Sequence, residues 1–170
     1  MPSARFPRNV FFVVVLVALA RCSYFYPLLP QRMASHFDLS GLPNGWMTKP
    51  LFFELYAVGV AIGIVVVFAP ALTIGRLPAS LINLPNKEYW LAPEHRAETN
   101  AFLQRSFAWF GCALLALEVV ALDLAMQANL VSPPHFSSES MLVCLGVFLI
   151  CTVWWTIDLL RHFAVPKSSI

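Results

Sequence analysis

Four long stretches of apolar residues constrain this chain more than any other feature of its sequence. They cover residues 10–29, 51–74, 106–127 and 141–160, and few charges interrupt them. A helix of about 20 apolar residues crosses the hydrocarbon core of a bilayer, and it satisfies its own backbone hydrogen bonds there. Hydrophobic residues make up 59% of the chain and charged residues 12%, which is too little charge for an ordinary soluble domain. The sequence therefore predicts an all-α fold, in which residues 1–170 form a single four-span membrane domain, a four-helix bundle.

The positions of lysine and arginine predict the orientation of these runs. Eight of these residues flank the runs on one side, and only Arg32 and Lys49 lie on the other. Loops rich in lysine and arginine stay in the cytoplasm. We therefore expect a multi-pass protein with both termini in the cytoplasm and a cytoplasmic loop at 75–105. The net charge of +2 is spread over these flanks, so we expect the lipid bilayer as a partner and no nucleic acid.

The first run has a second interpretation. Arg5 and Arg8 precede it, and it contains Ala18-Leu19-Ala20, which are features of a cleavable signal peptide. Apolar residues resume at Tyr24, and this favours a helix that stays in the protein. Cleavage of the first run remains the alternative.

The loop between the first two runs, residues 30–50, has the composition of an ordered structure. Pro30 and Pro43 restrict its backbone, and Gly41 and Gly45 permit positive φ angles. Asn44-Gly45 is a signal for a tight turn. We expect an ordered extracytoplasmic loop whose polar and aromatic side chains bind a ligand: His36, Asp38, Asn44 and Trp46.

The same segment resembles a bacterial membrane-protein family of unknown function. The resemblance rests on a Leu-Pro, His-Phe and Gly-x-Pro-x-Gly pattern, formed by Leu29, Pro30, His36, Phe37, Gly41, Pro43 and Gly45. The immunity protein against the sporulation-delay toxin has an N-terminal domain of this kind. The resemblance implies an inner-membrane protein that recognises an extracellular peptide or small ligand, with immunity or signalling as its role. It also implies that a cytoplasmic regulator could bind the loop at 75–105.

His36 and Asp38 also suggest a metalloenzyme, because imidazole and carboxylate groups bind metals and move protons. A zinc site needs three or four ligands, and the other outward candidates are His135 and Glu139. Hydrogen bonding of His36 to the loop backbone is the favoured alternative, so we expect no metal and no cofactor. Phosphate-binding glycine loops, nucleophile elbows, HExxH pairs and paired catalytic carboxylates are missing from the sequence, and we expect no enzyme.

Ionisable residues within the runs are the second candidate site. A lone charge at mid-membrane costs about 2.5 to 3.5 kcal/mol, so partners are expected. Arg21 and Glu118 both lie about 17 Å from the inner ends of their runs, and we predict that they form an intramembrane pair. Asp123 is an additional buried acid, which should face a different neighbour. Such a pair could simply lock the first helix to the third, or the three residues could serve a small transporter or proton-coupled component.

Two further signals concern the helices themselves. Gly59 and Gly63 form a GxxxG pair, which predicts close approach of another helix, within the bundle or between two copies. Pro93 is placed as the first residue of a helix that continues into the third run.

Overall fold

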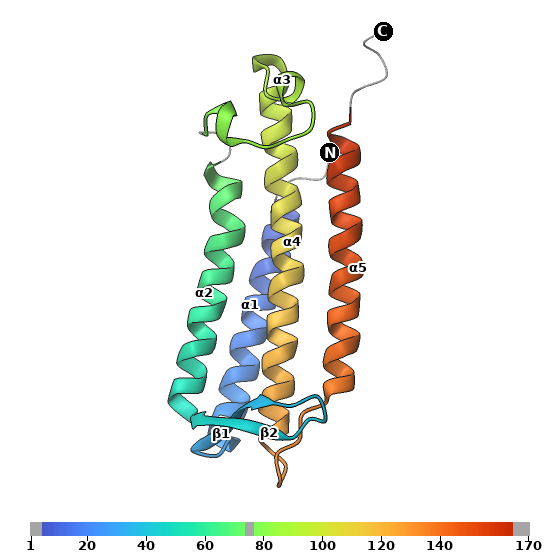
Figure 1. Cartoon of the computed structure of the whole chain (residues 1–170). Helices are drawn as coiled ribbons and strands as arrows, with labels where there is room; N and C mark the ends of the chain where they lie inside the picture. Colours follow the sequence, from blue (N-terminus) through green and yellow to red (C-terminus); the bar gives the residue numbers. More distant parts are fainter. Residues whose placement is uncertain (1–4, 74–76, 165–170) are drawn as a thin grey trace.

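A computed structural model describes residues 5–73 and 77–164 of the chain, which are mostly helical (Figure 1). The long helices are α1 (Arg5–Phe25), α2 (Lys49–Thr73), α4 (Pro93–Ala128) and α5 (Ser138–His162). A hairpin of two antiparallel strands, β1 (Arg32–Phe37) and β2 (Pro43–Thr48), connects α1 to α2. The short elements are η1 (Tyr26–Leu28), η2 (Ala79–Leu81) and α3 (Lys87–Trp90).

Three segments among the described residues are long and apolar enough to cross a membrane. These are Asn9–Leu28, which combines most of α1 with η1, and the helices α4 and α5. The chain is therefore a membrane protein. The fold is not purely α-helical as expected, because the loop between α1 and α2 forms a two-stranded sheet. A fourth span at α2 remains a prediction, since many side chains in its second half lie outside the description.

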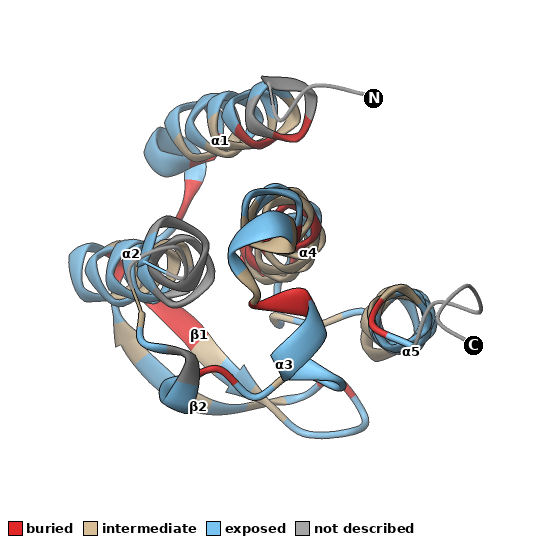
Figure 2. Cartoon of the chain, turned by 90° about the horizontal axis from the view of Figure 1, so that it is seen from above, coloured by how far each residue is buried: buried red, intermediate tan, exposed pale blue. Residues whose placement is uncertain are grey.

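Helix α4 is the centre of the molecule. Helices α1, α2 and α5 each pack against it, as the view along the helices shows (Figure 2). Phe11 of α1 packs on Cys112 and Leu115 of α4 in one buried cluster. As predicted, α4 begins with Pro93, whose missing N–H costs nothing in the first turn of a helix. None of the residues of α5 is fully buried, as suits a helix that exposes apolar side chains to lipid.

The loop between α2 and α4 is hydrogen-bonded to the residue that follows the C-terminal end of α5. Asn86 Nδ2 and Trp90 Nε1 both donate hydrogen bonds to the carbonyl of Phe163, at 2.9 and 3.2 Å. The Phe163 residue is completely buried, and the His162 ring stacks on Phe102 with a centroid separation of 3.5 Å. Because these contacts hold α3 against α4 and α5, this end of the bundle is closed by packing.

The turn of the hairpin lies at residues 38–42, before the predicted Asn44-Gly45 turn. Asp38 Oδ1 accepts hydrogen bonds from the backbone N–H groups of Ser40 and Leu42, both at 2.9 Å. Gly41 has the positive φ angle that was expected, +81°, and a Cβ atom there would collide with the carbonyl oxygen of Phe136. Asn44 and Gly45 lie instead within β2, because the Asp38 side chain supplies the hydrogen bonds that form the turn.

Candidate functional site

The hairpin is held across one end of the bundle by buried hydrogen bonds. Asn129, the residue after α4, accepts from Ala34 N at 2.7 Å and donates to Ala34 O at 2.9 Å. Its Nδ2 atom also donates to Ala125 O. On the other side, Lys49 Nζ donates to the carbonyl oxygens of Tyr26 and Leu29, at 3.1 and 3.0 Å. The hairpin is therefore a fixed cover over the ends of the helices.

A β-bulge in this cover places two side chains on the side of the helices. Ala34 pairs with Trp46 and His36 with Gly45, so that Ser35 has no partner of its own on β2. Both Ser35 and His36 line the space beneath the hairpin. A Cβ atom on Gly45 would lie 2.9 Å from His36 Nδ1. A glycine is thus required at position 45 because a larger residue would collide with the His36 ring. The positive φ angle expected at Gly45 is absent, and among the described glycines Gly41 alone has one.

Beneath the hairpin, a groove follows α4 between α2 and α5. It consists of a cavity of about 440 Å³ on the α2 side and one of about 410 Å³ on the α5 side. Both cavities are lined by Ser35, His36, Ala121 and Ala125, so they adjoin. The α2 side is mainly apolar, and its remaining lining residues are Met47, Phe52, Leu55, Tyr56, Gly59, Val60, Glu118 and Leu122.

Two polar groups of this groove lack partners among the described residues. The Glu118 carboxylate makes no hydrogen bond or ion pair with any of them. The hydroxyl oxygen of Tyr56 is buried and likewise has no partner within the described part of the chain. Gly59 also lines the groove, and a Cβ atom there would meet nothing within 4 Å. Within the bundle, the close helix approach predicted at Gly59 is wrong, because this glycine borders open space. The surroundings of Gly63 lie outside the described residues, and close approach between two copies stays a prediction.

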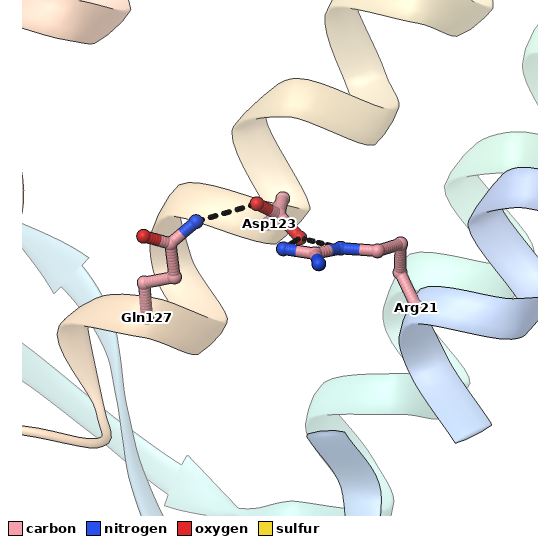
Figure 3. Close-up of polar contacts among 3 residues, drawn as sticks. All are labelled: Arg21, Asp123 and Gln127. Atoms are coloured by element: carbon pink, nitrogen blue, oxygen red, sulfur yellow. Dashed lines mark hydrogen bonds and ion pairs between the residues drawn. The ribbon is translucent and has the colours of Figure 1, made fainter. Parts of the chain in front are cut away.

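The predicted pairing of Arg21 with Glu118 is wrong, since the partner of Arg21 is Asp123 (Figure 3). Arg21 Nε and Nη2 each lie 2.6 Å from Asp123 Oδ1. Gln127 Nε2 donates to Asp123 Oδ2 at 2.6 Å, and the guanidinium also covers the ring of Phe25. This cluster is on the side of α4 that faces α1.

The predicted pairing was wrong because the depth of each side chain was counted from the inner end of its apolar run. Both helices begin well before the apolar runs suggested, at Arg5 and Pro93, so their inner ends were not comparable. Counted from the hairpin end, Arg21 is four residues before the end of α1 and Asp123 is five before the end of α4. These positions are about 6 and 7.5 Å deep, whereas Glu118 is about 15 Å deep.

The four candidate ligand-binding residues of the loop separate in the structure. His36 lines the groove, and Asp38 borders its α5 side while its Oδ1 atom forms the turn. Asn44 and Trp46 are exposed residues of β2 that line neither cavity, and Trp46 lies under Arg32. The described residues contain no group of three or more His, Cys, Asp or Glu that could hold a metal ion.

The sequence interpretation named Gly59 and Glu118 in other roles and missed Tyr56, Ala121 and Ala125 as residues of the groove. Tyr56 and Gly59 are three positions apart on α2, and Glu118, Ala121 and Ala125 follow helical spacing on α4. An acid in line with two alanines on one helix face is the signal that could have revealed it. Only the fold shows that this face is left uncovered by the helices that the structure describes.

A comparison with protein families finds a match to a domain of unknown function (DUF1648) over residues 13–60. The matched segment comprises most of α1, the hairpin and the first half of α2, and it contains His36, Tyr56 and Gly59. No curated protein and no solved structure matches the chain. The matched domain is typically found in membrane proteins, in agreement with the long apolar helices. The N-terminal part of this membrane protein is thus similar to a domain whose activity is unknown.

Proposed function

We propose that this protein is a membrane-embedded binding protein that takes a small amphiphilic ligand from the bilayer into the groove. The observation that carries the proposal is the groove itself, a mainly apolar space with a few polar groups. Ligand sites in proteins commonly have this character and a volume of about 300 to 1,000 Å³. The protein would act by recognition, and no enzymatic step is proposed.

The way into the groove is from the lipid. Leu55 of α2 and Leu142 of α5 line its two sides, and they are 52% and 62% exposed. Both helices pack against α4, and the hairpin covers one end (Figure 2). A ligand dissolved in the bilayer would enter sideways between α2 and α5, with its more polar part near Ser35 and His36.

Photo-crosslinking in lipid nanodiscs tests this function. The probe is dodecanol that carries a diazirine, and labelled peptides are identified by mass spectrometry. We expect labelling of the α2 and α4 segments that line the groove. Ala121→Phe fills the groove and should reduce this labelling at least tenfold. Ala116→Phe is the matched control, because Ala116 is exposed on α4 and lines a separate apolar cavity against α5 rather than the groove. Equal labelling of both variants, or no labelling of the wild type, would contradict the proposal.

Immunity or signalling is the physiological role that the family resemblance of the hairpin supports. A sensitive bacterial strain would produce wild-type protein, Ala121→Phe or His36→Ala at matched membrane levels during challenge with secreted antimicrobial peptides. Survival with the wild type and killing with both variants are the expected results. Killing in all strains would count against immunity and leave the binding proposal to be judged by crosslinking.

An inner-membrane location with four spans and cytoplasmic termini is part of the same proposal. It is supported by the distribution of lysine and arginine along the chain. Ser40, an exposed residue in the turn of the hairpin, should be labelled from outside the cell when it is replaced by cysteine. Labelling only after the cytoplasm is opened would reverse the orientation.

The proton-coupled transporter has less support. It required Arg21, Glu118 and Asp123 to act together, but Arg21 and Asp123 bind each other on the α1 side of α4. Glu118 is five residues before Asp123, which places it about 140° around the helix and on the groove.

A further inference from the structure

We infer that the ligand of the groove carries a protonated amine, for which Glu118 is the counter-ion and the Tyr56 hydroxyl a second hydrogen-bond acceptor. This inference rests on the proposed binding function and names the chemical class of the ligand. It depends on the juxtaposition of an unpaired acid, an unpaired hydroxyl and an apolar cavity.

The first step concerns the Glu118 carboxylate, which lacks a positively charged partner among the described residues. Glu118 lies about 15 Å from the hairpin end of α4, near the middle of a bilayer about 30 Å thick. A carboxylate at such a depth normally has a partner. None is found among the described residues, so a cation supplied from outside would complete the site.

The second step is that the nearby cationic groups are engaged elsewhere. Arg21 forms its ion pair with Asp123, and Lys49 donates to two backbone carbonyls and lies over the Tyr26 ring. His36 also lines the groove, but its Nδ1 atom lies within hydrogen-bond distance of Ser35 Oγ, at 3.2 Å. The protein thus keeps an anionic group on the groove while the nearby Arg21 and Lys49 side chains are used in structural contacts.

The third step is the number of hydrogen bonds. A primary ammonium group has three N–H donors, and the carboxylate and the hydroxyl of the groove can accept them. A charged pair of this kind is stronger than a neutral hydrogen bond, above all where water is excluded. A dodecyl alcohol offers one donor and no charge, whereas a fatty acid anion would be repelled by Glu118. The ligand is therefore selected by its cationic group.

Space for the apolar part is provided by small residues. Gly59 on α2 and Ala121 and Ala125 on α4 leave the cavity of about 440 Å³ open beside the acid. The exposed Leu55 lets a longer alkyl chain continue into the surrounding lipid. The site thus fits a lipophilic amine.

The test compares three dodecyl probes that differ only in the head group: amine, alcohol and carboxylate, each with the same diazirine, in nanodiscs of neutral lipid. We expect the amine to label the groove at a concentration at least tenfold lower than the alcohol, and the carboxylate least of all. Glu118→Gln should remove the preference for the amine and retain labelling by the alcohol. Glu54→Gln is the matched control, since Glu54 is an exposed acid of α2 outside the groove.

The outcomes separate this inference from the proposed function. Equal labelling by amine and alcohol in the wild type, or an unchanged preference in Glu118→Gln, overturns the inference and leaves binding in the groove intact. If no probe labels the groove, both proposals fail. Labelling of Glu118→Gln by the alcohol shows that the variant is folded, and Tyr56→Phe should then lower the preference for the amine by a smaller factor than Glu118→Gln.

Discussion

The two faces of α4 use acidic residues in opposite ways. On the face toward α1, Asp123 receives hydrogen bonds from Arg21 and Gln127 and is fully engaged (Figure 3). On the face between α2 and α5, Glu118 borders a groove and has no partner among the described residues. A single helix thus carries one acid that binds its neighbour and one that is left for a ligand.

The difference follows from the size of the side chains around each acid. Near Asp123, large side chains fill the interface with α1, where Phe25 and Leu29 are buried in one cluster with Met126. On the other face, Gly59 and Ala121 leave the space open. The closed face thus holds the acid and its partner together, whereas the open face leaves room for binding.

The largest expected effect comes from removing the anchor of the hairpin over the open face. Asn129→Ala leaves the buried N–H and C=O groups of Ala34 without partners, which should lower the free energy of unfolding by about 2 to 4 kcal/mol. Chemical denaturation in detergent measures this loss. Labelling by the alcohol probe should fall as well, because the groove loses its cover. An unchanged stability would show that the hairpin is held by other contacts.

The second largest effect is expected when the two acids of α4, Asp123 and Glu118, are neutralised in turn. Asp123→Asn weakens the ion pair and leaves Arg21 without a counter-ion, so the melting temperature should fall by about 5 °C. Glu118→Gln removes an unpaired charge and should leave the melting temperature unchanged or slightly higher. Differential scanning fluorimetry in the absence of added amine compares the two. A similar loss in both variants would break the distinction between the faces.

A smaller effect is expected at the two glycines. Gly45→Ala forces the His36 ring away from β2 and should cost about 1 kcal/mol, measured by denaturation. Gly59→Ala is the matched change in open space. It should raise stability by about 0.5 to 1 kcal/mol, because alanine favours a helix and nothing is displaced. Destabilisation by Gly59→Ala would mean that this side of the groove is closed.

The smallest effect is expected on the outer face of the hairpin. Asn44 is exposed on β2 and lines neither cavity, so Asn44→Ala should change stability by less than about 0.5 kcal/mol. Labelling of the groove by the amine and alcohol probes should also be unchanged. A clear loss of labelling would restore Asn44 as a ligand-binding residue.

Much of the helical part of this fold could be predicted from local sequence. The described residues of each apolar run lie almost entirely in helix, because backbone groups in lipid must bond within their own segment. Pro93 marks the start of α4, and the prolines and glycines of residues 30–50 indicated order in the loop. The two-stranded form of that loop was not predicted, because the strands are short and the bulge at Ser35 interrupts their alternation.

The candidate site was predicted only in part. His36 and Glu118 were both named, but they belong to one groove rather than to a loop site and an ion pair. Sequence by itself determined which segments are apolar helices and which residues on them are charged. The tertiary structure decided the partner of Arg21 and the openness of the face that carries Glu118. The position of the helix ends determines how deep each charged side chain lies, and the rotation of α4 about its axis determines which neighbour that side chain faces. Both depend on how the hairpin and α4 pack together.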